Sequence, residues 1–289
     1  MYLRKLIFAL FITVATTALA HDGHSHYPEI EVPSSDINLA TPWNGKRVAF
    51  LGDSMTDPNN KSTKRHYWWY LQQLTGIEPH VFARSGYQWD GIYKKAEEMN
   101  AALGDSIDVI FIWAGTNDYN HNTPIGKFYT EEQDSVNHNG KIEWRKHRRF
   151  SMNDSTFTGN INRVLSYLKH NYPDKQVIVM TPIHRGYAKF NDHNVQPDEN
   201  WSNAQGLYID EYVKTLKEGA MLWAVPVIDL YSDSGLFPME ENHVGYFHHG
   251  DSDLLHPNDN GHYRIARTIQ AHLNALTPTF EDSKTKCKT

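Results

Sequence analysis

Residues 47–54 read RVAFLGDS, and this stretch decides the fold. Its apolar run contains Val and Phe, which favour β-structure, and predicts a buried strand over Arg47–Leu51. Gly52 allows a sharp turn where a Cβ would clash. Ser54 then lies just beyond the carboxyl end of a strand, where open α/β sheets place their ligand sites. A serine there is a candidate nucleophile, but serine is a weak one and needs a base.

Three further blocks follow in the chain. Residues 83–86 (ARSG) end in Gly86, and residues 115–118 (GTND) contain Asn117. Residues 253–257 (DLLHP) contain Asp253 and, three positions later, His256. One local turn can bring the carboxylate of Asp253 to the imidazole of His256, where it would hold one tautomer and stabilise the charged ring. Taken alone, the Asp253–His256 pair is more typical of a capping pair at a helix start; beside the Ser54 and Asn117 blocks, catalysis is favoured.

These four blocks, in this order, resemble the SGNH/GDSL hydrolase family over roughly residues 45–275. The resemblance implies a three-layer α/β/α, flavodoxin-like sandwich with a five-stranded parallel sheet in the order 2-1-3-4-5. It also implies three oxyanion donors, which are the amides of Ser54 and Gly86 and the side chain of Asn117. The alternatives are an ordinary turn glycine and an asparagine that stabilises its own turn.

The chemistry that fits these blocks is acyl transfer. Ser54 would attack an ester carbonyl, and His256 would take its proton and return it to the leaving alcohol. Asp253 would orient His256. Asp53 and Asp118 flank the site, and we expect them to hold turns by bonds from side chain to backbone.

The rest of the chain alternates strands with helices. Further strands are expected over residues 80–83, 108–113, 176–180 and 225–230, and helices over 66–76, 90–103, 158–171, 203–222 and 258–276. This alternation predicts a parallel sheet with helices on both faces and right-handed crossovers. We expect one domain over residues 45–277, no internal repeat and no second domain.

Polar insertions separate several of these elements. Residues 119–151 are expected to be a wall or lid of the site, because loops of that length are usually functional. Residues 183–201 and 231–250 are the other two. Aromatic and hydrogen-bonding side chains near the site suit a polyhydroxylated ligand, and the candidate substrate-binding residues are Tyr87, Trp89, Tyr119 and His184.

The N-terminus predicts export. Residues 1–20 combine Arg4 and Lys5 with a short apolar run and a final ALA, which is the pattern of a signal peptide cleaved after Ala20. The alternative, a membrane anchor, is disfavoured because the apolar run is shorter than the roughly 20 residues of a spanning helix. Residues 21–44 would be an N-terminal extension and 278–289 a loose tail. The protein would then be secreted or periplasmic.

Composition excludes several partners. Arg4 and Lys5 are the charged residues of the first twenty, so cleavage changes the formal charge from −6 to −8. Such an acidic protein is a poor binder of nucleic acid or anionic lipid. With Cys287 alone, no internal disulfide can form. Histidines 21, 24 and 26, and 243, 248 and 249, could suggest a metal, but their spacing matches no metal motif. We predict no metal and no cofactor.

The sequence therefore predicts an exported serine esterase that removes acetyl groups from a carbohydrate. Its substrate would be a small ester or an acetylated glycan. Two alternatives remain open: a lipid or thioester acylhydrolase, and a non-catalytic carbohydrate-binding relative. The oligomeric state and the natural ester are not decided by the sequence.

Overall fold

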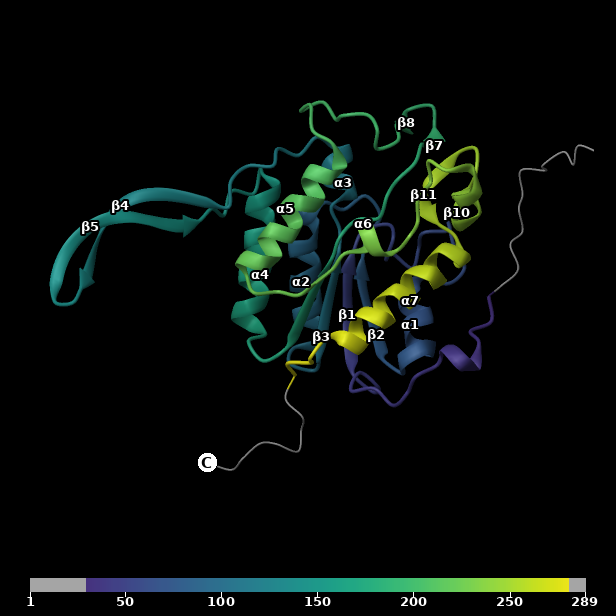
Figure 1. The fold of residues 1–289 in the computed structure, drawn as a ribbon, viewed down its shortest axis with the longest axis horizontal. Helices are drawn as coiled ribbons and strands as arrows, with labels where there is room; N and C mark the ends of the chain where they lie inside the picture. Colours follow the sequence, from purple (N-terminus) through teal and green to yellow (C-terminus); the bar gives the residue numbers. More distant parts are fainter. Residues whose placement is uncertain (1–29, 281–289) are drawn as a thin grey trace, which may run out of the picture.

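A five-stranded parallel sheet forms the centre of the molecule in the computed structural model, which describes residues 30–280 (Figure 1). Its strands are β1 (Arg47–Gly52), β2 (Glu78–Ala83), β3 (Val109–Trp113), β6 (Gln176–Met180) and β9 (Val227–Ile228). Their order, β2-β1-β3-β6-β9, confirms the flavodoxin-like arrangement expected from the sequence. Within residues 30–280 we find no helix long and apolar enough to cross a membrane.

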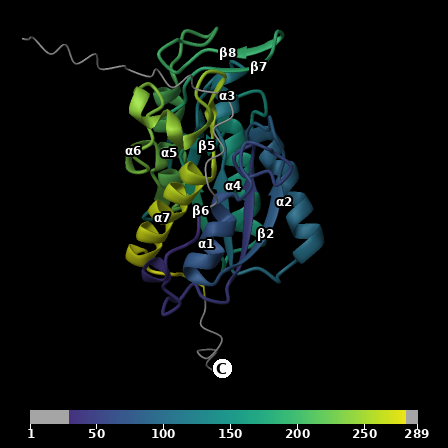
Figure 2. The same cartoon turned by 90° about the vertical axis from the view of Figure 1, so that its right-hand side faces the viewer.

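Helices cover both faces of this sheet, as Figures 1 and 2 show. They are α1 (Tyr67–Thr75), α2 (Trp89–Leu103), α4 (Phe157–Asn171), α5 (Ile209–Leu222) and α7 (Asp259–Ala275). Alternate residues of β1 explain the two layers, because successive strand side chains point to opposite faces. Val48 and Phe50 pack in the core that contains α1 and α7. Ala49 and Leu51 pack in the core that contains α2, α4 and α5.

Two helices begin differently from the prediction. Helix α5 starts at Ile209 rather than residue 203, because Asn203 Oδ1 accepts the amides of Gln205 and Leu207 and holds a turn there. Helix α2 starts at Trp89, one residue before the predicted start, so Asp90 lies in its first turn. Asn258 caps α7, since its side chain accepts the amide of Gly261.

A second, antiparallel sheet was not predicted. It contains β7 (Ala188–Asn191), β8 (Asn194–Gln196), β10 (Phe247–His249) and β11 (Asp253–Pro257), in the order β10-β11-β7-β8. The insertions 183–201 and 231–250 supply three of these strands, together with the short helices α6 (Leu230–Asp233) and η2 (Glu241–Tyr246). His256 consequently lies on strand β11.

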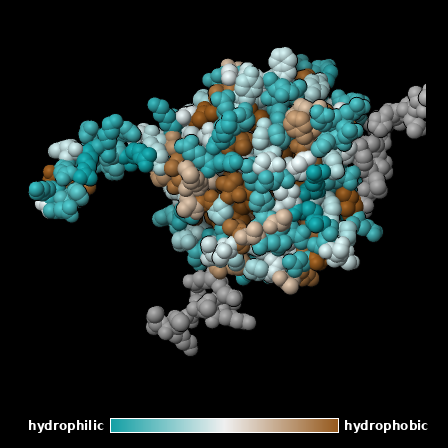
Figure 3. All heavy atoms as spheres, in the orientation of Figure 1, coloured by the Kyte–Doolittle hydropathy of each residue, from teal (hydrophilic) through white to brown (hydrophobic). Residues whose placement is uncertain are grey.

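The stretch 119–151 is not a lid. After the short helix α3 (Thr116–Asn120) it forms a long hairpin, β4 (Tyr129–His138) and β5 (Lys141–Phe150), which projects from the body (Figure 1). We call this hairpin the arm. Its turn residues Asn139 and Gly140 have φ values of 54° and 79°, which suit the left-handed turn of a tight hairpin. Figure 3 shows the arm as mainly hydrophilic.

The described ends of the chain pack against the body. Trp43 is buried and donates its indole N–H to the carbonyl of Leu273 at 3.0 Å. Phe280 stacks edge-on against Trp43, with ring centroids 5.2 Å apart. The short helix η1 (Ser34–Asp36) precedes this contact. The predicted signal peptide 1–20 and the histidines at 21, 24 and 26 lie outside the described residues.

Candidate active site

Ser54 lies in a tight turn at the carboxyl end of β1. The amides of Thr56 and Asp57 donate to the Asp53 carbonyl, and the Asp53 side chain accepts the Met55 amide at 3.0 Å. A Cβ at Gly52 would come within 2.3 Å of the Thr56 hydroxyl, so the turn requires glycine there. The expected structural role of Asp53 agrees with these bonds.

Three side chains form one hydrogen-bonded row. Ser54 Oγ lies 2.9 Å from His256 Nε2, and His256 Nδ1 lies 3.0 Å from Asp253 Oδ2. Because a carboxylate only accepts hydrogen bonds, Nδ1 carries the imidazole proton and Nε2 is left to accept from the serine. Asp253 also accepts the backbone amide of His256 at 3.0 Å. The structure thus brings Ser54, 202 positions away in sequence, into line with the predicted pair.

The two nearby carboxyl groups have opposite pKa shifts. Burial opposes the ionisation of Asp253, but the hydrogen bonds and charge of His256 outweigh it, and the pKa of Asp253 lies below its usual value. Burial raises the pKa of Asp53 to about 7, despite the Met55 amide and the charges of His256 and Arg185. Asp253 is therefore the carboxyl group that is ionised beside the imidazole at neutral pH.

Gly86 and Asn117 line the same cleft as Ser54 and His256. Gly86 has a φ of 82°, a conformation that favours glycine, and no atom lies within 4 Å of the position a Cβ would take. Asn117 Nδ2 donates to the Tyr87 carbonyl at 3.0 Å and lies 3.4 Å from Asp53 Oδ2. Both residues are close enough to the serine to serve the same ligand.

Two supporting residues were missed by the sequence reasoning. Asp57 accepts both the amide and the hydroxyl of Ser85 at 2.8 Å, and so fixes the turn that contains Gly86. Arg185 is fully buried, and its guanidinium contacts the carbonyl and hydroxyl of Thr116, next to Asn117. Burial lowers the pKa of Arg185 to about 10, so it remains charged at neutral pH. Asp57 follows Ser54 by three positions, and that proximity was the available signal.

The cleft has a volume of about 510 Å³, and most of the residues that line it have polar side chains. Besides the residues above, its lining includes Asn60, Lys61, Ser62, Ser85, Lys189, Asn194, Gln196, His248 and Ser252. Its larger apolar side chains are Phe190 and Leu255. The Phe190 ring lies 5.4 Å from the His256 ring, between their centroids. The second sheet therefore supplies many of the residues that line the cleft.

A second cleft adjoins this one and shares Gly86 and Asn117 with it. Of the four aromatic and histidine residues predicted to bind substrate, three line neither cleft. Trp89 is fully buried beneath Asp118, which accepts its amide, so the prediction for Trp89 is wrong. Tyr87 packs its ring near Arg84 and Lys95.

His184 and Tyr119, the other two, differ in position. His184 contacts Glu199 at 2.5 Å and stacks on Tyr231, with ring centroids 3.8 Å apart. These contacts place His184 behind the cleft wall. Tyr119 alone of the four lines an open cleft, the one that adjoins the first.

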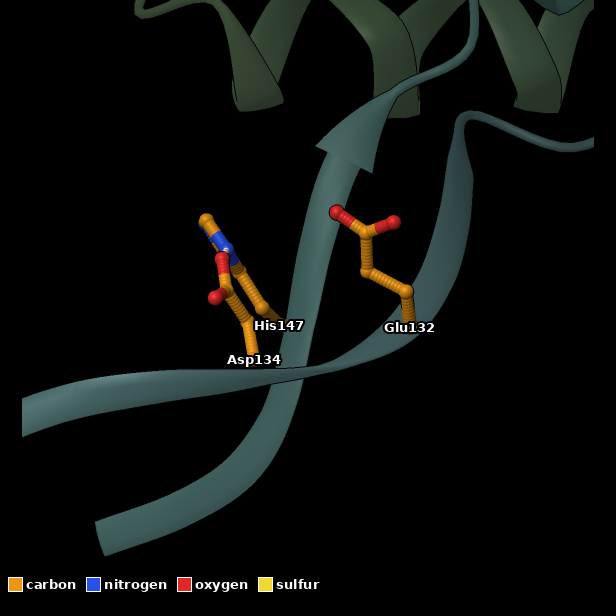
Figure 4. A group of neighbouring side chains, drawn as sticks. All are labelled: Glu132, Asp134 and His147. Atoms are coloured by element: carbon orange, nitrogen blue, oxygen red, sulfur yellow. Dashed lines mark hydrogen bonds and ion pairs between the residues drawn. The ribbon is translucent and has the colours of Figure 1, made fainter.

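One group of side chains in the described part of the chain has a spacing suited to a metal, and it lies on the arm (Figure 4). It comprises Glu132, Asp134 and His147. Arg149 donates to Glu132 at 2.5 Å and to Asp134 at 3.1 Å, so one guanidinium already pairs with both carboxylates. This cluster is exposed, and we assign it no metal.

Comparisons with known proteins agree with the fold. A protein from Lactobacillus plantarum superimposes with a TM-score of 0.62 at 24% identity, covering 81% of this chain and 99% of its own. A protein described as a possible lipase from Chitinophaga pinensis gives 0.60 at 16% identity, covering 80% and 98%. No curated protein is significantly similar in sequence.

The sequence profile of the GDSL-like Lipase/Acylhydrolase family matches residues 50–264. The match begins within β1 and extends into α7, so it includes the serine turn, both neighbouring loops and the Asp253–His256 strand. It confirms the resemblance drawn from four short blocks. The chain belongs to the GDSL-like lipase/acylhydrolase family.

Proposed function

We propose that this protein is a serine esterase in which Ser54, His256 and Asp253 form the catalytic triad. The row of contacts from Ser54 Oγ through His256 to Asp253 carries the proposal. His256 Nε2 accepts the serine proton as Oγ attacks the ester carbon, and then donates it to the leaving alcohol. Water then attacks the acyl-enzyme, with His256 again taking the proton and returning it to Ser54, and the acid is released.

The oxyanion formed in each attack would be stabilised by the amides of Ser54 and Gly86 and by Asn117 Nδ2. Asn117 Nδ2 carries two hydrogens. One is directed to the Tyr87 carbonyl, while the contact with Asp53 is 3.4 Å long and weak. The second hydrogen is therefore available to an oxyanion at little cost.

The substrate we propose is an acetyl ester of a carbohydrate. Most residues that line the cleft carry an amide, hydroxyl, imidazole or ammonium group, and such groups bind the hydroxyls of a sugar. A long acyl chain would instead need a channel lined by several aliphatic side chains, and Leu255 is the one large aliphatic residue that lines this cleft. A short acyl group therefore suits this cleft better than a fatty one.

The test compares 4-nitrophenyl acetate with 4-nitrophenyl octanoate, followed by acetate release from a panel of acetylated glycans. The proposal expects higher kcat/KM on acetate and release of acetate from at least one glycan. Octanoate preference would support the lipid acylhydrolase alternative instead. No turnover of either ester would support a non-catalytic carbohydrate binder.

We also propose that the protein is exported. The support is the pattern of residues 1–20, with Ala18, Leu19 and Ala20 at the cleavage site. Protein exported by a bacterial host should begin at His21. Intact mass spectrometry that finds Met1 on the exported protein would contradict this.

A further inference from the structure

A second cleft adjoins the first at the candidate oxyanion donors. It has a volume of about 670 Å³ and shares Gly86, Asn117, Asn194 and Gln196 with the cleft that contains Ser54. Its remaining walls come from residues 119–122 and 202–204 and from the β7–β8 hairpin. Because the shared residues form a common border, the two clefts make one continuous trough, with the serine in one half.

The walls of the second cleft are held in place before any ligand binds. Tyr119 donates its hydroxyl to the Trp201 carbonyl at 2.5 Å, and Asn203 donates to the Tyr119 carbonyl at 3.0 Å. Asn122, in a left-handed conformation with φ of 61°, accepts the Ala204 amide at 2.6 Å. A preformed site loses less conformational entropy when it binds a ligand.

Arg185 fixes the border between the clefts. Its Nη2 donates to Gln196 Oε1 at 2.7 Å, which sets the orientation of that amide. Gln196 Nε2 then donates to Asn194 Oδ1 at 3.1 Å. A fully buried guanidinium thus orders a pair of amides that faces both halves of the trough.

Several polar side chains of the second cleft remain free to bind a ligand. Within residues 30–280, the side chains of Asn120, His121 and His193 have no hydrogen-bond partner. Trp201, next to the lining residue Ser202, is 65% exposed. Hydrogen-bonding groups beside an exposed aromatic ring suit a sugar, whose hydroxyls bind polar groups and whose C–H face packs on aromatic rings.

We propose that this second cleft binds the sugars that adjoin the acetylated one, so that the protein acts on an oligosaccharide or polysaccharide chain. The inference rests on the proposed function. An acetyl group and one sugar can be accommodated in the first half of the trough. The second half is too polar for a fatty chain, since its larger apolar side chains are Val195, Pro197 and the aromatic Tyr119. A continuing sugar chain meets both requirements.

The experiment measures acetate release from chemically acetylated mono- and hexasaccharides of two series, β-1,4-glucan and β-1,4-xylan. The readout is the ratio of kcat/KM per acetyl group between hexasaccharide and monosaccharide. Each sugar bound in the second cleft adds contacts that the monosaccharide lacks. We expect a ratio of at least about tenfold in one series, equivalent to about 1.4 kcal/mol.

The variant is the double substitution His121→Ala/His193→Ala, in which both exposed imidazoles are removed without touching the core. We expect its ratio to fall toward one. His170→Ala, on the exposed last turn of α4, is the matched control and should keep the full ratio.

Three results would overturn the inference. Sugars hydrolysed with a ratio near one in both series would refute the extended site and leave the esterase proposal intact. A double variant that keeps the full ratio would show that these imidazoles do not line the bound chain. If 4-nitrophenyl acetate is cleaved and no acetylated sugar is, the carbohydrate proposal fails and this inference fails with it.

Discussion

Two of the Asp–His pairs in the described part of the chain have nearly equal lengths but lie in very different settings. Asp253 and His256 lie 3.0 Å apart with side chains 8% and 9% exposed. Asp134 and His147 on the arm lie 2.9 Å apart with side chains 40% and 49% exposed (Figure 4). The pKa of the aspartate lies below its usual value in both pairs. A hydrogen bond between these two residue types is therefore not what distinguishes a reaction site.

What differs is the third partner and the surroundings. His256 presents its second nitrogen to Ser54 inside a cleft, whereas His147 lies on an open hairpin. Water screens the exposed pair, so the pair contributes little to stability. The buried pair acts in a medium of lower effective dielectric, where an oriented charge has a larger effect. The following predictions test this contrast.

The largest effect is expected from Ser54→Ala. Removing the nucleophile of a comparable triad lowers kcat on the order of 10⁶-fold. Thermal stability should change little, because the substitution removes one hydroxyl from a turn that is held by other bonds. Turnover of 4-nitrophenyl acetate above a few per cent of wild type would refute the serine mechanism.

Asp253→Asn is expected to come next. The amide cannot stabilise the charged imidazole or hold the same tautomer, and a related substitution in another fold costs roughly 10⁴ in kcat. Asp134→Asn is the matched control on the arm and should leave kcat unchanged.

The double variant with His256→Ala sharpens this test. Asp253 acts only through His256, so the two effects should be strongly non-additive. If Asp253→Asn still lowers kcat by its full factor when residue 256 is alanine, the assignment of Asp253 is wrong.

Asp57→Asn should produce an intermediate loss. It weakens both bonds that position Ser85 and hence Gly86, and small displacements of such groups can cost about 10²-fold in rate. We expect kcat to fall while KM changes little. A higher KM with an unchanged kcat would contradict a role in positioning an oxyanion donor.

A buried histidine should make stability depend on pH in the body but not on the arm. Burial lowers the pKa of His66 to about 4. The unfolded chain, with a pKa near 6.5, therefore binds a proton that the folded state resists, and stability falls as the pH decreases below 6.5. Between pH 7 and 5 the loss from His66 is about 2 kcal/mol.

His66→Gln should remove that loss, and His138→Gln on the arm should not. Asp53 contributes in the opposite sense, because its raised pKa favours the folded state at low pH. The measurement is therefore the free energy of unfolding by denaturant at pH 7 and pH 5, compared between each variant and the wild type. Equal pH slopes for wild type and His66→Gln would contradict the assignment.

The smallest effect is expected from shortening the arm. Replacing residues 131–148 with a short Gly-Ser turn keeps Tyr129 and Phe150, which stack on each other and, through Phe150, on Trp223. Activity on 4-nitrophenyl acetate should stay within about twofold, because the arm residues do not line the cleft. A larger loss would revive the expectation that this stretch covers the site.

Much of the fold could be predicted because its information is local. The core strands are short apolar runs, and the helices between them show one apolar face, so each could be recognised without knowledge of the others. The blocks at Ser54, Gly86, Asn117 and His256 were recognisable for the same reason. Each is a short pattern at the end of an element, and their order along the chain pointed to one family.

The arm was missed because both of its faces meet solvent, and neither strand shows the alternation that marks a half-buried strand. Asn139-Gly140 was the remaining signal for a hairpin. The second sheet was missed for another reason. Strands β7 and β8 are only 4 and 3 residues long, and β7 pairs with β11 from a distant part of the chain.

By itself, the sequence determined which residues could react, because Ser54, His256 and Asp253 carry the required groups wherever they lie. Only the tertiary structure decided which other residues they meet. Trp89 and Tyr119 are both aromatic residues close to a recognised block, and both are buried, yet Trp89 packs beneath Asp118 whereas Tyr119 lines a cleft. Burial of this kind depends on contacts between elements far apart in the chain, and no local pattern encodes them.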